Sequence, residues 1–158
     1  MRQIFILNFL LISLTSFGQK IQWIPFNWVG DSVSGKYFDK LAMIIPITLD
    51  NLPKGMNMQL DLGAYETFIY GNSIKAYLKK YSEFNNKIDT TLKFKIQSQT
   101  NYKFRNVALK LGNVSFGNRN IGQFKNFGDN IPEDSINTLT EKNIGTIGPD
   151  LFENKILI

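Results

Sequence analysis

Met58-Gln-Leu-Asp-Leu-Gly-Ala-Tyr-Glu-Thr-Phe-Ile-Tyr70 is the stretch of this sequence that decides the fold. An apolar strand pattern runs into one aspartate, Asp61, and Gly63 follows two residues later. Glycine permits a sharp turn, and loops held by a rigid scaffold often carry functional side chains. The pattern therefore predicts a strand that presents the Asp61 carboxylate into a cleft. The alternative is a turn carboxylate that bonds its own backbone.

The segments on either side of this stretch predict further strands. Residues 43–49 form an apolar run in which Pro46 indicates an edge or bulged strand, because proline lacks a backbone donor. Apolar residues alternate in 92–96 and again in 107–111, and the Gly112-Asn113 pair that follows is a tight hairpin turn. The chain is therefore expected to be mainly β.

One helix is predicted directly after the aspartate stretch. Ile74, Tyr77, Leu78 and Tyr81 repeat at helical spacing. Ser73 stands before them and is a residue type that caps helix N-termini.

Composition limits the chemistry that this chain can perform. Its 158 residues are enough for one domain with a core, and the chain contains no cysteine and no histidine. Disulfides, thiol chemistry and catalysis by Ser-His or Cys-His pairs are thereby excluded. Carboxylates, hydroxyls, lysine and arginine remain, and we expect no cofactor and no bound metal.

The first 19 residues have the pattern of a signal peptide. Arg2 precedes an apolar run over residues 4–14, and Ser16-Phe17-Gly18 places small residues near an expected cleavage site. We therefore expect an exported protein, periplasmic or secreted, without stable membrane insertion after cleavage. The absence of cysteine favours a bacterial protein over a eukaryotic secreted one. A buried N-terminal strand or helix is the alternative.

The formal net charge is +5, and the basic residues are interleaved with acidic ones rather than gathered on one stripe. Lys75, Lys79 and Lys80 share the predicted helix, but Glu83 follows closely. Interleaved charges of this kind indicate a solvated face. Nucleic-acid binding requires a clustered basic patch with exposed aromatic residues, so no nucleic-acid partner is expected.

The aspartate stretch resembles the active-site strand of the retropepsin and pepsin families of aspartic peptidases. Their pattern is two apolar residues, Asp, Thr or Ser, Gly, and Ala or Ser, followed three residues later by Thr or Ser. The residues that match it are Asp61, Gly63, Ala64 and Thr67. A later segment, residues 146–152, resembles the second signature of each lobe, in which Ile147 and Gly148 pass beside the active loop before a short helix.

The resemblance covers residues 41–158 and implies one lobe of the acid-protease closed β-barrel, with one or two short helices. Residues 20–40 would form an extended N-terminal segment. The family hydrolyses peptide bonds with two carboxylates that share one proton and activate a water molecule. Asp61 would supply one carboxylate, and a homodimer partner or a missing second lobe would supply the other. The expected substrate is a peptide or protein.

Two residues depart from the family pattern. Leu62 stands where the family has a Ser or Thr whose hydroxyl bonds to the partner loop, and Pro149 replaces an arginine that many retropepsins have. Leucine has no donor, so catalytic activity stays open. A catalytically inert lobe that binds extended peptides and a periplasmic β-rich structural module are the alternatives.

Several other residues have structural interpretations. Asp150 followed by Glu153 indicates a helix capping box, and Gly145 and Gly148 indicate a close strand crossing. Residues 92–116 are the best region for a hairpin flap over the acid. The aromatic residues that we expect in the core are Tyr102, Phe104, Phe124 and Phe127.

Overall fold

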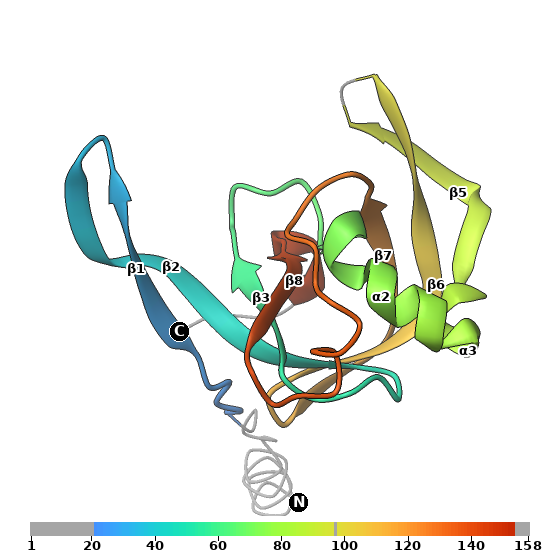
Figure 1. Cartoon of the computed structure of the whole chain (residues 1–158), viewed down its shortest axis with the longest axis horizontal. Coiled ribbons are helices and arrows are strands. Elements are labelled where there is room, and N and C mark those ends of the chain that lie inside the picture. The colour runs from blue at the N-terminus through green and yellow to red at the C-terminus, as the bar shows by residue number, and fades with distance from the viewer. Residues whose placement is uncertain (1–20, 97, 154–158) are drawn as a thin grey trace, which may run out of the picture.

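The computed structural model describes residues 21–96 and 98–153 of the chain. The expected signal peptide lies outside these residues. Within them the chain is mainly β, with 52% strand, 14% helix and a mixed sheet of eight strands. Figure 1 shows two hairpins projecting from opposite sides of the central body. The mainly β prediction is therefore confirmed, and the acid-protease barrel stays a proposal.

The sheet follows the order β1-β2-β3-β8-β4-β7-β6-β5, and an additional pairing joins β2 to β6. Because β2 is second and β6 is second from last in this order, the additional pairing joins strands near the two ends of the sheet. The strand bounds are β1 Asn27–Val33, β2 Lys36–Leu49, β3 Met56–Leu60, β4 Phe68–Tyr70, β5 Ile88–Ile96, β6 Gln99–Leu111, β7 Val114–Phe124 and β8 Lys142–Ile147. Strand β2 runs without interruption across residue 40, where the sequence placed the start of the lobe.

Pro46 lies in an internal strand, so the prediction of an edge or bulged position is wrong. Strand β2 has β3 on one side, with Pro46 opposite Asn57, and β1 and then β6 on the other. The Pro46 carbonyl accepts a hydrogen bond from the Gly112 amide at 2.7 Å. Its missing N–H faces the same way, at the point where β1 has ended and pairing with β6 begins at Ile47. The N–H that proline lacks would therefore lie between the stretch of β2 that pairs with β1 and the stretch that pairs with β6.

The three strands around the Asp61 turn are arranged with β8 in the middle. Strand β8 is parallel to β3 and antiparallel to β4. The chain must therefore pass over β8 when it leaves β3 at Leu60 and re-enters the sheet at Phe68. Strand β4 continues the sheet by pairing in parallel with β7.

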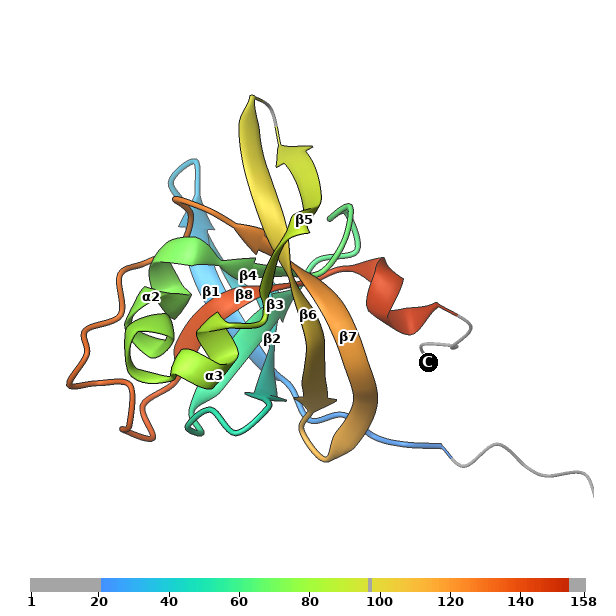
Figure 2. The same cartoon turned by 90° about the vertical axis from the view of Figure 1, so that its right-hand side faces the viewer.

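Strands β5, β6 and β7 form two consecutive hairpins. The turn between β6 and β7 falls at Gly112-Asn113, as the sequence predicts. The β5–β6 hairpin extends away from the body of the molecule (Figures 1 and 2).

Short helices complete the described part of the fold: α2 Gly71–Lys80, α3 Ser82–Asn85 and the 3₁₀ helix η1 Pro149–Phe152. Figure 2 shows α2 and α3 on one side of the sheet and η1 on the other. No helix in the described part of the chain is long and apolar enough to cross a bilayer.

Helix α2 confirms the predicted periodicity but not the predicted cap. Ile74 and Tyr77 are buried, and Leu78 and Tyr81 are partly buried against the core. The helix begins at Gly71, so Ser73 lies inside it, fully buried. The helix starts early because β4 ends at Tyr70 and leads directly into it.

Tyr77 is fully buried, and its hydroxyl has no hydrogen-bond partner among the described residues. Burial, with a smaller contribution from Tyr81, raises the pKa of Tyr77 to about 12. A phenol with a raised pKa keeps its proton in the folded state while the unfolded chain ionises near pH 10. The free energy of unfolding therefore falls as pH rises from 10 to about 12, because the unfolded chain loses the Tyr77 proton more readily than the folded chain.

We expect Tyr77→Phe to raise the free energy of unfolding by about 1 kcal/mol at pH 7, because a buried unsatisfied hydroxyl is removed. The variant should also lose less stability than the wild type between pH 10 and 12. Urea unfolding at pH 7 and pH 11 measures both effects. The matched control is Tyr81→Phe, which should lower stability because the Tyr81 hydroxyl donates to Asn137 at 3.0 Å. Equal losses in the two variants would contradict the prediction.

Candidate active site

Asp61 lies where the chain leaves β3 and crosses β8. Its amide donates to the Ile147 carbonyl at 3.0 Å, which extends the pairing of β3 and β8 by one residue. The chain then turns, and the Ala64 amide donates to the Asp61 carbonyl at 3.2 Å. The Gly63 amide donates to the Asp61 carboxylate, to Oδ1, at 2.9 Å. The sequence offered two interpretations of Asp61: a carboxylate presented outward, or one that bonds its own turn. The carboxylate does bond its own turn, and the residue nevertheless remains exposed.

Gly145 and Gly148 make the crossing possible, as the sequence predicts. A β-carbon on Gly145 would lie 2.1 Å from the Phe68 carbonyl oxygen, and one on Gly148 would lie 2.5 Å from the Glu66 carbonyl carbon. Any larger residue would push the two backbone segments apart. Gly145 therefore permits β4 to lie directly against β8. Gly148 permits the acid loop, which we define as residues 61–67, to lie directly against the residue that follows β8.

Thr67 ties the end of the acid loop to the segment after β8. Its side chain is 2% exposed, and its hydroxyl donates to Asp150 Oδ1 at 2.8 Å. The same hydroxyl accepts the Gly148 amide at 3.1 Å. These partners are 83 and 81 positions away in the sequence. A buried amide without a partner costs about 1–3 kcal/mol, so Thr67 stabilises this junction.

The expected capping box at Asp150 and Glu153 is wrong. Helix η1 follows Gly148 as its N-cap and has no side-chain cap bond. Asp150 lies inside η1, and its carboxylate accepts from Thr67. Asp150 bonds Thr67 instead of capping the helix because the Thr67 hydroxyl is a donor within reach of its carboxylate. A hydrogen bond to a charged acceptor is stronger than one between neutral groups.

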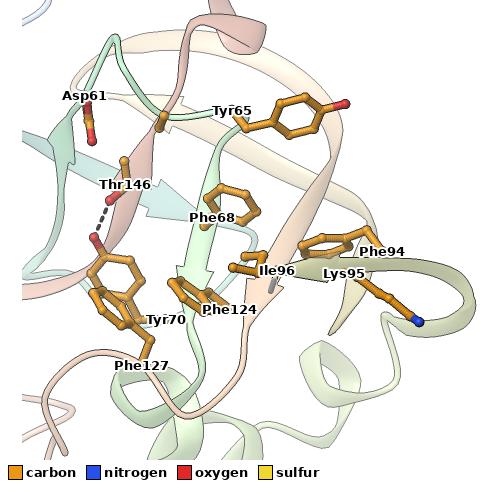
Figure 3. Close-up of a pocket in the computed structure, with 11 residues that line it drawn as sticks. Asp61, Tyr65, Phe68, Tyr70, Phe94, Lys95, Ile96, Phe124, Phe127 and Thr146 are labelled. Carbon is orange, nitrogen blue, oxygen red and sulfur yellow. Dashed lines mark hydrogen bonds between the residues drawn. The ribbon is translucent and has the colours of Figure 1, made fainter. Parts of the chain in front are cut away.

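A pocket of about 620 Å³ opens beside Asp61 (Figure 3). Strands β4, β5, β7 and β8, the acid loop and the segment after β7 supply its walls. The lining residues are Asp61, Ala64, Tyr65, Phe68, Tyr70, Phe94, Lys95, Ile96, Phe124, Phe127 and Thr146. Among the described residues, Asp61 is the one carboxylate in this lining. The pocket thus combines a single acid at one end with an aromatic interior.

Aromatic rings in contact form most of the pocket wall. Phe68 lies with its ring centroid 5.8 Å from that of Phe94 and 6.2 Å from that of Phe124. Phe127 stacks on Phe124 at 4.6 Å and meets the edge of Tyr70 at 4.7 Å. Rings that hold each other in place form a preformed apolar surface, which suits a ligand with apolar groups.

Tyr70 and Thr146 form a polar contact inside this pocket. Their hydroxyls are hydrogen-bonded to each other from β4 and β8. Thr146 lies opposite Phe68 across the β4–β8 pairing and opposite Gln59 on β3. The two hydroxyls add polar groups to a wall that is otherwise aromatic.

The structure corrects part of the aromatic prediction. Phe104 is fully buried in the core, as predicted, but Phe124 and Phe127 line the pocket. Tyr102 is partly buried, and the Lys125 ammonium lies 3.9 Å from its ring centroid. Sequence reasoning also missed Phe68, Phe94 and Thr146 as pocket residues. Alternation places such residues on a common strand face but does not say whether that face is open.

Each predicted site residue has a definite place in this arrangement. Asp61 and Ala64 line the pocket, whereas Thr67, Ile147 and Gly148 are buried beneath the turn. The two large side chains of the turn are exposed, Leu62 to 61% and Tyr65 to 89%, although Tyr65 also lines the pocket. Leu62 is therefore not packed in this chain.

The predicted flap region includes a hairpin at the pocket. Three residues at the outer end of β5, namely Phe94, Lys95 and Ile96, belong to the lining. Lys95 belongs to the lining, but its ammonium points away from the pocket (Figure 3). No three acidic or histidine side chains in the described residues lie close enough together to hold a metal ion.

Comparisons with protein-family models, with curated proteins and with solved structures found no match for this chain.

Proposed function

We propose that this chain is an exported aspartic-peptidase-like protein in which Asp61 supplies one of two carboxylates for peptide-bond hydrolysis. The observation that supports this most is an exposed carboxylate at a strand crossing, on the wall of a 620 Å³ pocket. In such chemistry one carboxylate accepts a proton from water while the other donates one to the peptide. The aromatic pocket would accept side chains of the bound peptide.

The second carboxylate must come from outside the lining of this pocket. Asp61 is alone among the described lining residues, and two carboxylates have to lie close together to share a proton. A second copy of the chain, or a second lobe, could bring it. The exposed side chains of Leu62 and Tyr65 beside Asp61 provide apolar surface against which such a partner could pack.

The second candidate function is peptide binding without hydrolysis. Leu62 favours it, because a leucine at that position offers no hydroxyl to fix a partner loop. Positional errors of about 1 Å can lower rates by about a hundredfold. A pocket that binds peptides would remain useful to such a protein even if the acid pair never formed.

A mixture of peptides incubated with the mature chain between pH 3 and pH 7 tests the proposal. If two chains form the site, the cleavage rate should rise more steeply than in proportion to the protein concentration at low concentration, because the active species is the dimer. Peptide binding without cleavage at any pH would select the second candidate. Absence of both would contradict the two candidates and favour a structural role.

A further inference from the structure

The β5–β6 hairpin is divided by an irregularity in its pairing. The register shifts between Asp89 and Lys93, opposite Lys103, so that three residues of β5 have no partner in the ladder. Such bulges bend a strand and weaken pairing locally. We call the part beyond it, residues 93–96 paired with 99–102, the outer arm. The outer arm contributes the β5 residues of the pocket wall (Figure 3).

Lys103 stands at the base of the outer arm and contacts both sides of the pocket. Its ammonium forms an ion pair with the carboxylate of Glu66, which belongs to the acid loop. The same ammonium lies 5.5 Å from the ring centroid of Phe94 on the outer arm. One lysine thus joins the loop that presents Asp61 to a ring that lines the pocket.

The ion pair is largely shielded from water, which makes it more than a surface contact. The side chains of Lys103 and Glu66 are 27% and 11% exposed. The second carboxylate oxygen of Glu66, Oε1, is buried without a hydrogen-bond partner among the described residues. Removal of one charge from such a pair leaves the other buried and uncompensated, whereas removal of both is far better tolerated.

The outer arm has a second attachment, to the segment after β7. The Lys125 amide donates to Asn101 Oδ1 at 2.9 Å, and Gln99 Nε2 donates to the Lys125 carbonyl at 2.9 Å. These bonds hold the arm to the segment after β7. These bonds do not involve the acid loop. The Glu66–Lys103 ion pair is therefore a separate attachment of the outer arm, which can be removed while these bonds remain.

We propose that Glu66 and Lys103 are positioning residues that fix the outer arm relative to Asp61. Their ion pair holds the base of the arm to the acid loop, and the contact of Lys103 with Phe94 extends this hold to the pocket wall. The width of the pocket for an extended peptide then depends on this pair. The identity of the ligand rests on the proposed function, but the link can be measured without a ligand.

Amide hydrogen exchange of the whole mature chain tests the link. The main variant is Glu66→Gln/Lys103→Gln, which removes both charges and leaves neither one unpaired. We expect amides of the outer arm to exchange about tenfold faster in it, while those of β2 and β3 keep their rates. Lys103→Arg, which retains a cation for Glu66 and Phe94, should retain most of the protection.

The matched control is Arg105→Gln on the same strand. Arg105 forms an ion pair with Asp89 on the body side of the irregularity, so its loss should leave the outer arm protected. Unchanged exchange of the arm in the double variant would overturn the proposal. Equal acceleration by Arg105→Gln, or acceleration spread over the whole chain, would also overturn it, because the pair would then be a general stabiliser.

Peptide binding separates this proposal from the proposed function. If the wild type binds peptides, the double variant should bind them several-fold more weakly. If no variant binds peptides but the outer arm still loosens in the double variant, the proposed function fails while the positioning role stands. A loosened arm with unchanged peptide affinity would overturn the effect on pocket width.

Discussion

Asp61→Asn should abolish the proposed peptide hydrolysis, with a loss of about a thousandfold or more. Asparagine has the size of aspartate and can accept the Gly63 amide that now bonds Oδ1 at 2.9 Å, so the turn should keep its shape. It cannot exchange a proton with water, and positioned acid–base groups contribute about 10²–10⁴ in rate. Cleavage of a peptide mixture between pH 3 and pH 7 gives the measurement.

The control for this variant is Asp31→Asn on the β1–β2 hairpin. Asp31 is also exposed, and its carboxylate also accepts a nearby backbone amide, that of Ser32 at 2.6 Å. It lies outside the pocket lining, so this substitution should leave hydrolysis intact. Hydrolysis that survives in Asp61→Asn would remove Asp61 from the reaction. Peptide affinity should survive in Asp61→Asn, because the aromatic wall is unchanged.

Gly145→Ala should prevent folding or cost about 4 kcal/mol or more, close to the whole stability of a small domain. The new β-carbon would lie 2.1 Å from the Phe68 carbonyl oxygen and 2.9 Å from the terminal carbon of Met58. The methionine can move, but Phe68 is fixed in β4 between β8 and β7. Relief of the clash therefore requires separation of β4 from β8. Soluble yield, circular dichroism and urea unfolding measure the result.

Gly117→Ala is the control that separates a clash from backbone strain. Gly117 has φ +69°, and no atom of the described residues lies within 4 Å of the place that a β-carbon would take, so alanine there meets only conformational strain. Such strain costs about 1–2 kcal/mol, and the variant should fold. A Gly145→Ala protein as stable as Gly117→Ala would show that β8 and β4 do not approach as closely as the geometry requires.

Local pattern was sufficient for the elements around the site. Helical spacing identified α2, and glycine with asparagine located the turn between β6 and β7. The acid turn was predictable because Gly63 follows Asp61 directly after an apolar strand, and the Gly63 amide does bond Asp61. Each of these features depends on residues that are near one another in the chain.

Other features required the order of the strands. Strand β2 is internal and tolerates Pro46 because pairing with β1 ends before it and pairing with β6 begins beyond it. Ser73 is buried because β4 leads directly into α2. The pairing of Thr67 with Asp150 depends on where β8 passes. No local preference specifies these contacts, since they join segments whose separation is decided by the whole topology.

The sequence by itself determined a mainly β chain with one carboxylate on a glycine turn. Only the tertiary structure decided that Phe124 and Phe127 face an open pocket while Phe104 is buried. Periodicity records which face of an element is apolar. Whether that face is covered depends on distant segments, and here β8 and the β5–β6 hairpin leave an opening beside Asp61.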